Sequence, residues 1–479
     1  MSFSKSLASV VAGIVAATVV TSLPACASQV GDAGIDGTRL DAVWAVPFLG
    51  LLVSIAILPL AAPHFWHHHY GKVTAAWALS FLVPFAMMFG VQLTHSEFLH
   101  VTLMEYVPFI TVLFALYTIS GGVFIDGTLT ASPFRNTAIL AVGALIASVT
   151  GTTGASVLLI RPLLRANANR KYIVHVVVFF IFLVSNIGGS LTPLGDPPLY
   201  IGFLKGVDFT WPAIHLWQIT ALVAAILLSV FFLLDTVLML RENEQVRAAS
   251  ADRIAIQPKG LINIALLVAV VAVILASAFW KTDLHIPIGG IQVDAPNILR
   301  VIVLLGFASM SLLLTPAAYR ESNSFTWGPI VEVAKLFAGI FVTIIPVIAM
   351  LKAGSAGAFA PVLALVTSQS GAPDNAMYFW LTGGLSSFLD NAPTYLVFFN
   401  AAGGDPQTLM GPMAKTLAAI SAGAVFMGAN TYIGNAPNFM VKAIAEEAGV
   451  RMPSFFGYML WSGALLIPCF VLTSIVFFS

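Results

Sequence analysis

The sequence predicts an all-α polytopic membrane protein with ten transmembrane helices and two re-entrant hairpins, arranged as two inverted-topology repeats with broken helices. Three observations predict this fold. Of the 479 residues, 59% are hydrophobic and only 9% are charged, against about 25% charged residues in soluble domains. Many stretches are apolar over the about 20 residues that a helix needs to cross a bilayer. Finally, one motif occurs in both halves of the chain and interrupts an apolar run each time.

The motif reads Gly189-Ser-Leu-Thr-Pro-Leu-Gly-Asp-Pro-Pro198 in the first half and Gly428-Ala-Asn-Thr-Tyr-Ile-Gly-Asn-Ala-Pro437 in the second. The copies align without a gap at an offset of 239 residues, which pairs Asp196 with Asn435. Irregular backbone at membrane depth is tolerated only where it is buried in protein or lines a cavity. Paired interruptions in two halves therefore indicate the binding site of a transporter.

The remaining elements follow from hydropathy and from turn-forming residues. Apolar spans are predicted at 42–62, 73–93, 102–124, 213–240, 260–280, 297–315, 328–351 and 455–478, with broken spans at 172–204 and 412–445. Segments 136–164 and 376–400 fit poorly as simple spans. They contain Thr150-Gly-Thr-Thr-Gly154 and Leu389-Asp-Asn-Ala-Pro393, which are clusters typical of turns. We therefore predict a re-entrant hairpin in each.

The distribution of Lys and Arg orients these elements. Positive residues are concentrated on cytoplasmic loops, and they cluster here at 165–171 and in 241–259. With those segments inside, 42–240 forms a first inverted repeat, 241–259 a cytoplasmic linker and 260–479 a second inverted repeat. We expect a multi-pass protein in the lipid bilayer of a bacterial inner (plasma) membrane.

The N-terminal residues have the features of a targeting segment. In residues 1–27, Lys5 precedes an apolar segment that ends in Ala25-Cys-Ala27. This layout is typical of a secretory signal peptide with its cleavage site. An uncleaved N-terminal membrane helix and a lipid anchor are the alternatives.

Oxygen-bearing side chains gather at the predicted breaks. Each hairpin tip is expected to meet the broken helix of its own half, so that two sites form. Hard cations such as Na⁺ prefer oxygen ligands. No Cys or His lies in either set, so a zinc or copper site is not expected, and we expect no cofactor apart from Na⁺ and H⁺ as transported ions. The candidate ion- or substrate-binding residues are Thr150, Thr152, Thr153, Asn186, Thr192 and Asp196 in the first half, and Ser387, Asp390, Asn391, Thr431 and Asn435 in the second.

Asp196 and Asp390 are the most informative of these residues. A carboxylate within a membrane span is costly and is a functional hypothesis by default. The alternative role, capping of a half-helix N-terminus, is compatible with ion binding. Among other polar residues, Asp235 is predicted at the membrane interface and His175 against a neighbouring carbonyl. The His64–His69 cluster is predicted in an interfacial loop, with pH sensing as the alternative.

Two motifs carry a resemblance to a known family. Ser387-Phe-Leu-Asp-Asn-Ala-Pro393 and Leu191-Thr-Pro-Leu-Gly-Asp196 resemble the second-hairpin and first broken-helix motifs of the ion transporter superfamily, in its arsenite permease and NhaD-type sodium/proton antiporter branch. The resemblance covers nearly the whole chain after about residue 40. It implies homodimers, elevator-like alternating access and sodium/proton exchange. By position, it implies that Na⁺ is bound by Ser387, Asp390 and Asn391 in the second half, and by Asp196 with the hydroxyls of Thr150 and Thr152 in the first. Gly195-Asp-Pro-Pro198 is also close to a signature of sodium-coupled dicarboxylate carriers in the same superfamily.

Three functions remain open from the sequence. The first is exchange of Na⁺ or Li⁺ for protons, favoured by two central aspartates because one carboxylate can hold either a cation or a proton. The second is a sodium-coupled citrate or dicarboxylate carrier, and the third is an arsenite-type efflux permease. An enzyme is not expected, since the chain lacks the His-Glu-x-x-His and Gly-x-Ser-x-Gly motifs. A net charge of +0 with no basic block also argues against nucleic acid as a partner.

Overall fold

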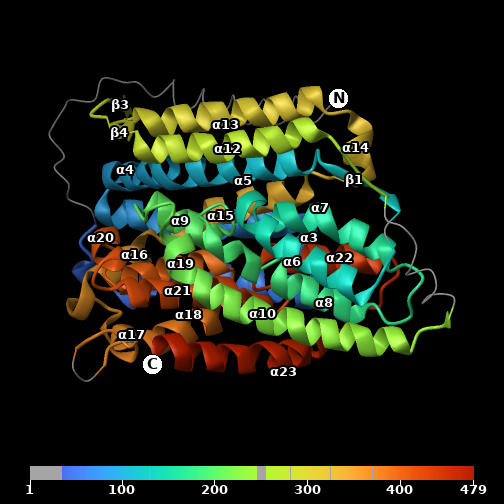
Figure 1. Ribbon diagram of the computed structural model, residues 1–479. Coiled ribbons are helices and arrows are strands. Elements are labelled where there is room, and N and C mark those ends of the chain that lie inside the picture. The colour runs from blue at the N-terminus through green and yellow to red at the C-terminus, as the bar shows by residue number, and fades with distance from the viewer. Residues whose placement is uncertain (1–34, 129, 245–254, 281, 324, 369–370) are drawn as a thin grey trace.

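The computed structural model describes residues 35–479 except 129, 245–254, 281, 324 and 369–370 (Figure 1). Within these described residues, nine helices are long and apolar enough to cross a membrane, or up to ten if the bent pair Gly328–Thr343 and Ile345–Lys352 forms one span. The predicted all-α polytopic fold is thus confirmed. The predicted signal peptide or N-terminal helix, residues 1–27, lies outside the described residues.

The first four long helices are α2 (Val46–Ala61), α3 (Pro63–Phe89), α4 (Val91–Val101) and α5 (Val107–Ser120). A π-helical turn, Thr102–Tyr106, joins α4 to α5, so the span begins at Val91 and not at the predicted residue 102. The reason is that Gly90 alone, with φ 94°, makes the turn after α3. A positive φ is readily available to glycine. The His64–His69 cluster lies within α3, which corrects its prediction as a loop.

The first hairpin and broken helix follow. Their elements are α6 (Pro133–Thr150), α7 (Thr152–Ala166), α8 (Val174–Leu183), η4 (Ile187–Leu191), α9 (Pro197–Leu204) and α10 (Trp211–Leu240). Only Gly151, with φ 81°, separates α6 from α7. The two helices pack against each other, so the turn lies at the predicted cluster.

The second half also contains a hairpin followed by a broken helix. Its elements are α12 (Leu261–Phe279), α13 (Ala295–Leu314), α14 (Ala317–Ser322), α15 (Gly328–Thr343), α16 (Ile345–Lys352), α17 (Ala360–Leu365), α18 (Asn375–Phe388), α19 (Asn391–Ala401), α20 (Pro406–Met410), α21 (Ala414–Met427), η6 (Gly428–Asn430), α22 (Ala436–Glu447) and α23 (Phe455–Thr473). The helices α18 and α19 form the second hairpin, with the turn at Leu389 and Asp390.

Two short antiparallel ribbons complete the described structure. Strand β1 (Phe124–Thr128) pairs with β2 (Ala255–Lys259), and β3 (His285–Ile288) pairs with β4 (Ile291–Asp294). The end of the predicted 241–259 linker is therefore a strand held against the segment that follows α5.

The broken helices lie at the centre of the molecule. In Figure 1, α12, α13, α4 and α5 form a layer on one side, while α10 and α23 lie on the opposite side. The span Val174–Leu191 is 89% buried, whereas the other candidate spans are between 17% and 44% buried. The hairpin helix α18 packs on α21, and α19 packs on α9. The polar breaks are thereby enclosed by protein, which is the condition under which membrane proteins tolerate them.

Candidate functional site

Both copies of the motif have the same local backbone. Gly195 lies against Gly189, and an added Cβ at Gly195 would come within 2.1 Å of the Gly189 carbonyl oxygen. In the second copy, a Cβ at Gly434 would come within 2.6 Å of the Gly428 carbonyl oxygen. The unwound segment folds back on the preceding turn in each half, and this close approach requires glycine.

We expect Gly195→Ala to destabilise the protein by about 1–3 kcal/mol, because the methyl group has to displace backbone atoms. Thermal unfolding of the purified protein in detergent measures the effect. Gly463→Ala, in α23, is the matched control, since no atom lies within 4 Å of its added Cβ. Equal melting temperatures for the two variants would contradict the close approach.

Equivalent hydrogen bonds join each hairpin to the motif of its own half. The hydroxyl of Thr192 donates to the carbonyl oxygen of Ser148, and that of Thr431 donates to the carbonyl oxygen of Ser387. Each threonine hydroxyl also accepts from the backbone N–H two residues further on, at 3.1 Å and 3.2 Å. Each hairpin tip therefore meets the interrupted helix of its own half, as predicted from the sequence.

Asp196 lies where the two halves meet, and its side chain is buried, with the residue 1% exposed. Its Oδ1 accepts from the Thr152 hydroxyl at 2.8 Å and from Asn435 Nδ2 at 3.1 Å. Its Oδ2 accepts from Asn391 Nδ2. Thr152 and Asn391 are equivalent positions of the two tips, and Asn435 is the equivalent of Asp196. The sequence led us to expect two sites, but these contacts join both hairpins and both motifs in one centre.

Asp390 is the N-cap of α19, the second helix of its hairpin. Its Oδ1 accepts from the backbone N–H of Ala392 at 3.0 Å, and its Oδ2 makes no hydrogen bond with the described residues. Asp390 is half-buried. The capping role expected as an alternative is thus present, and one carboxylate oxygen stays available to a ligand.

No cationic side chain of the described residues pairs with the two aspartates of the centre. Every ion pair within the described part of the chain involves an acid other than Asp196 and Asp390. The donors to Asp196 are a hydroxyl and two amides, which are neutral. A buried carboxylate without a positive partner is costly. A bound cation or a proton would remove that cost.

Three asparagines extend the centre. Asn186 Nδ2 donates to Asn438 Oδ1 at 2.7 Å, and Asn438 Nδ2 donates to the carbonyl oxygens of Gly428 and Thr431 at 2.8 and 2.9 Å. Asn430 Nδ2 donates to Ser387 Oγ at 2.9 Å. Asn430 Oδ1 is buried and has no hydrogen-bond partner among the described residues. Because a buried unpaired acceptor is unfavourable, this oxygen is available to a ligand.

Some predicted site residues are peripheral, and one contributor was missed. The Thr150 hydroxyl donates to the Ile146 carbonyl oxygen of its own helix at 3.2 Å, and the Thr153 hydroxyl makes no hydrogen bond with the described residues. Asn430 was recognised from the sequence as one of the oxygen-bearing residues of the second half, whereas Asn438 was not among the candidates. The available signal was an amide side chain within an apolar span, where polar residues mark functional sites.

The surroundings of two further residues differ from what the sequence suggested. Asp235 lies near the end of α10, as predicted, but protein encloses its side chain and the residue is 0% exposed. It pairs with Arg170 Nη2 at 2.6 Å and with His175 Nε2 at 2.8 Å. His175 was expected to pack against a backbone carbonyl, and it meets this carboxylate instead. Arg170 belongs to the group of Lys and Arg residues that follows the first hairpin. Its side chain is nevertheless buried, because it pairs with the buried Asp235 carboxylate.

Interrupted helices that enclose a polar centre are the way in which secondary transporters build their binding sites. The fold and this centre therefore define a multi-pass membrane transporter. Residues 37–478 match the family described as "Putative citrate transport", and the chain belongs to that family. Similar proteins include uncharacterized transporters of Mycobacterium bovis and Mycobacterium tuberculosis. Each is 26% identical over 329 residues, which cover 66% of this chain and 71% of the relative. The family indicates a permease and not an enzyme.

Proposed function

We propose that the protein exchanges Na⁺ or Li⁺ for protons across the inner membrane, by alternating access of the Asp196 centre. The observation that carries this proposal is a carboxylate that is buried between both hairpin tips and bonded only to neutral donors. Such a group can be neutralised either by a cation or by a proton. Competition of the two for one carboxylate couples their movements.

The proposed Na⁺ ligands come from both halves. The ion would be bound most directly by Asp196, Asp390 and Asn391, because two carboxylates offset the free-energy cost of removing its hydration water. The unpaired Asn430 Oδ1 and the adjacent Ser387 Oγ offer neutral oxygens beside the second tip. An all-oxygen set of this kind suits a hard cation.

The repeats and the homodimer are part of the same proposal. The equivalent hydrogen bonds of Thr192 and Thr431 support two repeats, 42–240 and 260–479, that are related by the motif offset. Helix α10 ends at Leu240 and α12 begins at Leu261, so the proposed linker, 241–259, lies between these two helices. The homodimer implied by the family resemblance is testable by light scattering coupled to size-exclusion chromatography.

Cation-coupled citrate uptake is the second candidate, because the family description names citrate transport. The charges of the centre oppose it. A citrate carries up to three negative charges and would meet two acids but no Arg or Lys. At about 4 Å and an effective dielectric near 20, each unscreened like-charge pair costs about 4 kcal/mol. Bound Na⁺ ions would have to offset this repulsion.

Transport in liposomes separates the two candidates. Purified protein is reconstituted with an internal pH-sensitive dye, a pH gradient is imposed, and Na⁺, Li⁺, K⁺ and citrate are added in turn. We expect Na⁺ or Li⁺ alone to move protons. Labelled citrate that accumulates only with Na⁺, without proton movement when citrate is absent, would establish the citrate carrier instead.

Asp390→Asn tests the second carboxylate in the same assay. We expect exchange to be lost, because the variant removes a charge that binds the cation. Asn is as good a helix N-cap as Asp, so the Asn391–Ala401 helix keeps its cap and the protein stays folded. Asp390→Ala is the comparison, since it also removes the cap, at a cost of about 1 kcal/mol. Undiminished exchange by Asp390→Asn would remove Asp390 from the proposed ligands.

A further inference from the structure

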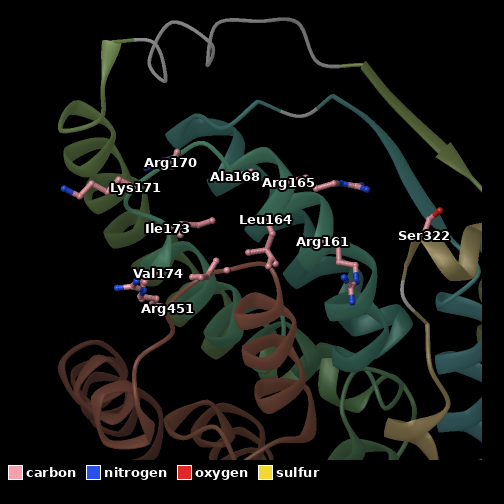
Figure 2. A pocket seen from close by; sticks show the side chains of 13 residues that line it. Arg161, Leu164, Arg165, Ala168, Arg170, Lys171, Ile173, Val174, Ser322 and Arg451 are labelled. Atoms are coloured by element: carbon pink, nitrogen blue, oxygen red, sulfur yellow. The ribbon is translucent and has the colours of Figure 1, made fainter.

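A second polar region lies apart from the Asp196 centre. A cavity of about 680 Å³ lies between the end of α7, the segment that leads into α8 and the loop after α22. Figure 2 shows its lining, in which Leu164, Ile173 and Val174 lie between charged side chains. None of the 13 lining residues is acidic. Five are cationic, namely Arg161, Arg165, Arg170, Lys171 and Arg451.

Two of the five positive charges have acidic partners. Arg170 pairs with Asp235 at 2.6 Å, and its Nε lies 4.0 Å from the Glu242 carboxylate. Arg161 lies 3.4 Å from Glu447, whose side chain is 68% exposed, so that this pair is weak. Arg165, Lys171 and Arg451 form no ion pair with the described residues. Five cations of the lining face three acidic partners, Asp235, Glu242 and Glu447, so the cavity keeps an excess of positive charge.

Neighbouring groups hold several of these cations in place. Arg165 Nη2 donates to the Ile125 carbonyl oxygen at 2.8 Å. Lys171 Nζ lies 5.4 Å from the centroid of the Tyr172 ring. The Arg170 side chain is 1% exposed, and its Nε has no hydrogen-bond partner among the described residues. Cations that are already positioned lose less entropy when they bind an anion.

We propose that this cavity binds a multivalent oxyanion, either a free di- or tricarboxylate or the phosphate group of a lipid. Guanidinium groups match the geometry of carboxylates and phosphates. The volume lies within the range of small-molecule pockets, about 300–1,000 Å³. Arg165 and Lys171 come from the first half and Arg451 from the second, so an anion held by all three bridges the halves. This role goes beyond cation exchange, because the anion binds outside the Asp196 centre.

Calorimetric titration of the purified full-length protein with citrate and with inorganic phosphate tests the proposal. We expect the double variant Lys171→Gln/Arg451→Gln to bind the anion about tenfold or more weakly, since each charged hydrogen bond that is lost contributes to affinity. Both side chains are exposed, so the variant should fold. Lys72→Gln, an exposed lysine of α3, is the matched control and should bind like the unaltered protein. Added NaCl should weaken binding.

A parallel titration into nanodiscs with and without phosphatidylglycerol separates the two sources of the anion. Citrate or phosphate binding that the double variant loses indicates a free oxyanion. A loss confined to phosphatidylglycerol binding indicates a lipid headgroup. Absence of binding of all three probes, or equal binding by the double variant, would overturn the proposal. Na⁺/H⁺ exchange is measured on the same samples without citrate, and the double variant should retain it. Failure of the anion site is therefore distinct from failure of the exchange mechanism.

Discussion

Replacing Asp196 by Asn is expected to abolish ion exchange while the protein remains folded and inserted. The amide has nearly the same size and can still accept from Thr152, so the packing of the centre is kept. The formal charge that attracts the cation is lost. At about 4 Å and an effective dielectric of about 20, that charge contributes about 4 kcal/mol, which corresponds to about a thousandfold in affinity. Proton movement driven by Na⁺ in liposomes is the measurement.

The repeat provides a matched control for Asp196→Asn. Asn435 is the equivalent of Asp196 in the second motif, and its Nδ2 lies 3.1 Å from Asp196 Oδ1. The double variant Asp196→Asn/Asn435→Asp returns one carboxylate to the same centre from the opposite side. We expect it to recover part of the exchange that the single variant loses. If Asp196→Asn alone exchanged ions at the full rate, Asp196 would not belong to the mechanism.

Replacing Asp235 by Leu is expected to lower the free energy of unfolding by about 3–5 kcal/mol, which is the usual cost of leaving a buried charge without its partner. The buried charge that loses its direct partner is that of Arg170, whose side chain is 1% exposed and whose other acid, Glu242, lies 4.0 Å away. Asn136 Nδ2, 2.9 Å from Asp235 Oδ2, would lose one of its two acceptors and keep Asn167 Oδ1 at 3.0 Å. Thermal unfolding in detergent, followed by intrinsic fluorescence, measures the loss.

The double variant Arg170→Met/Asp235→Leu is the control for this effect. Replacement of both members of a buried pair by apolar residues is often nearly neutral, so the double variant should be more stable than Asp235→Leu alone. His175 would remain without its carboxylate, and recovery should therefore be incomplete. A single variant that melts at the same temperature as the unaltered protein would show that the pair contributes nothing to stability.

The sequence by itself determined the fold class and the places where helices break. Bilayer thickness sets the length of an apolar span, so hydropathy along the chain is enough to locate most spans. Turn chemistry is equally local, since the glycine between α6 and α7, Gly151, has the positive φ that such a turn needs. The motif repeat indicated Asp196 and Asn435 as site residues, and the turn clusters of the predicted hairpins indicated Thr152 and Asn391, because polar groups in apolar spans are rare unless they have a role.

Only the tertiary structure decided which of these residues meet. Asp196 and Asn391 are 195 residues apart, and nothing in the local pattern of either motif specifies their contact. The same holds for the contact between Asp235 and Arg170, which are 65 residues apart. From the sequence, Asp235 was predicted only to lie at the membrane interface. Side-chain contacts between distant segments depend on how whole helices pack, whereas hydropathy and turn signals act over one helix. That packing brings the polar residues of both halves into one Asp196 centre, where the sequence predicted two sites. It also forms a cationic cavity that both halves line.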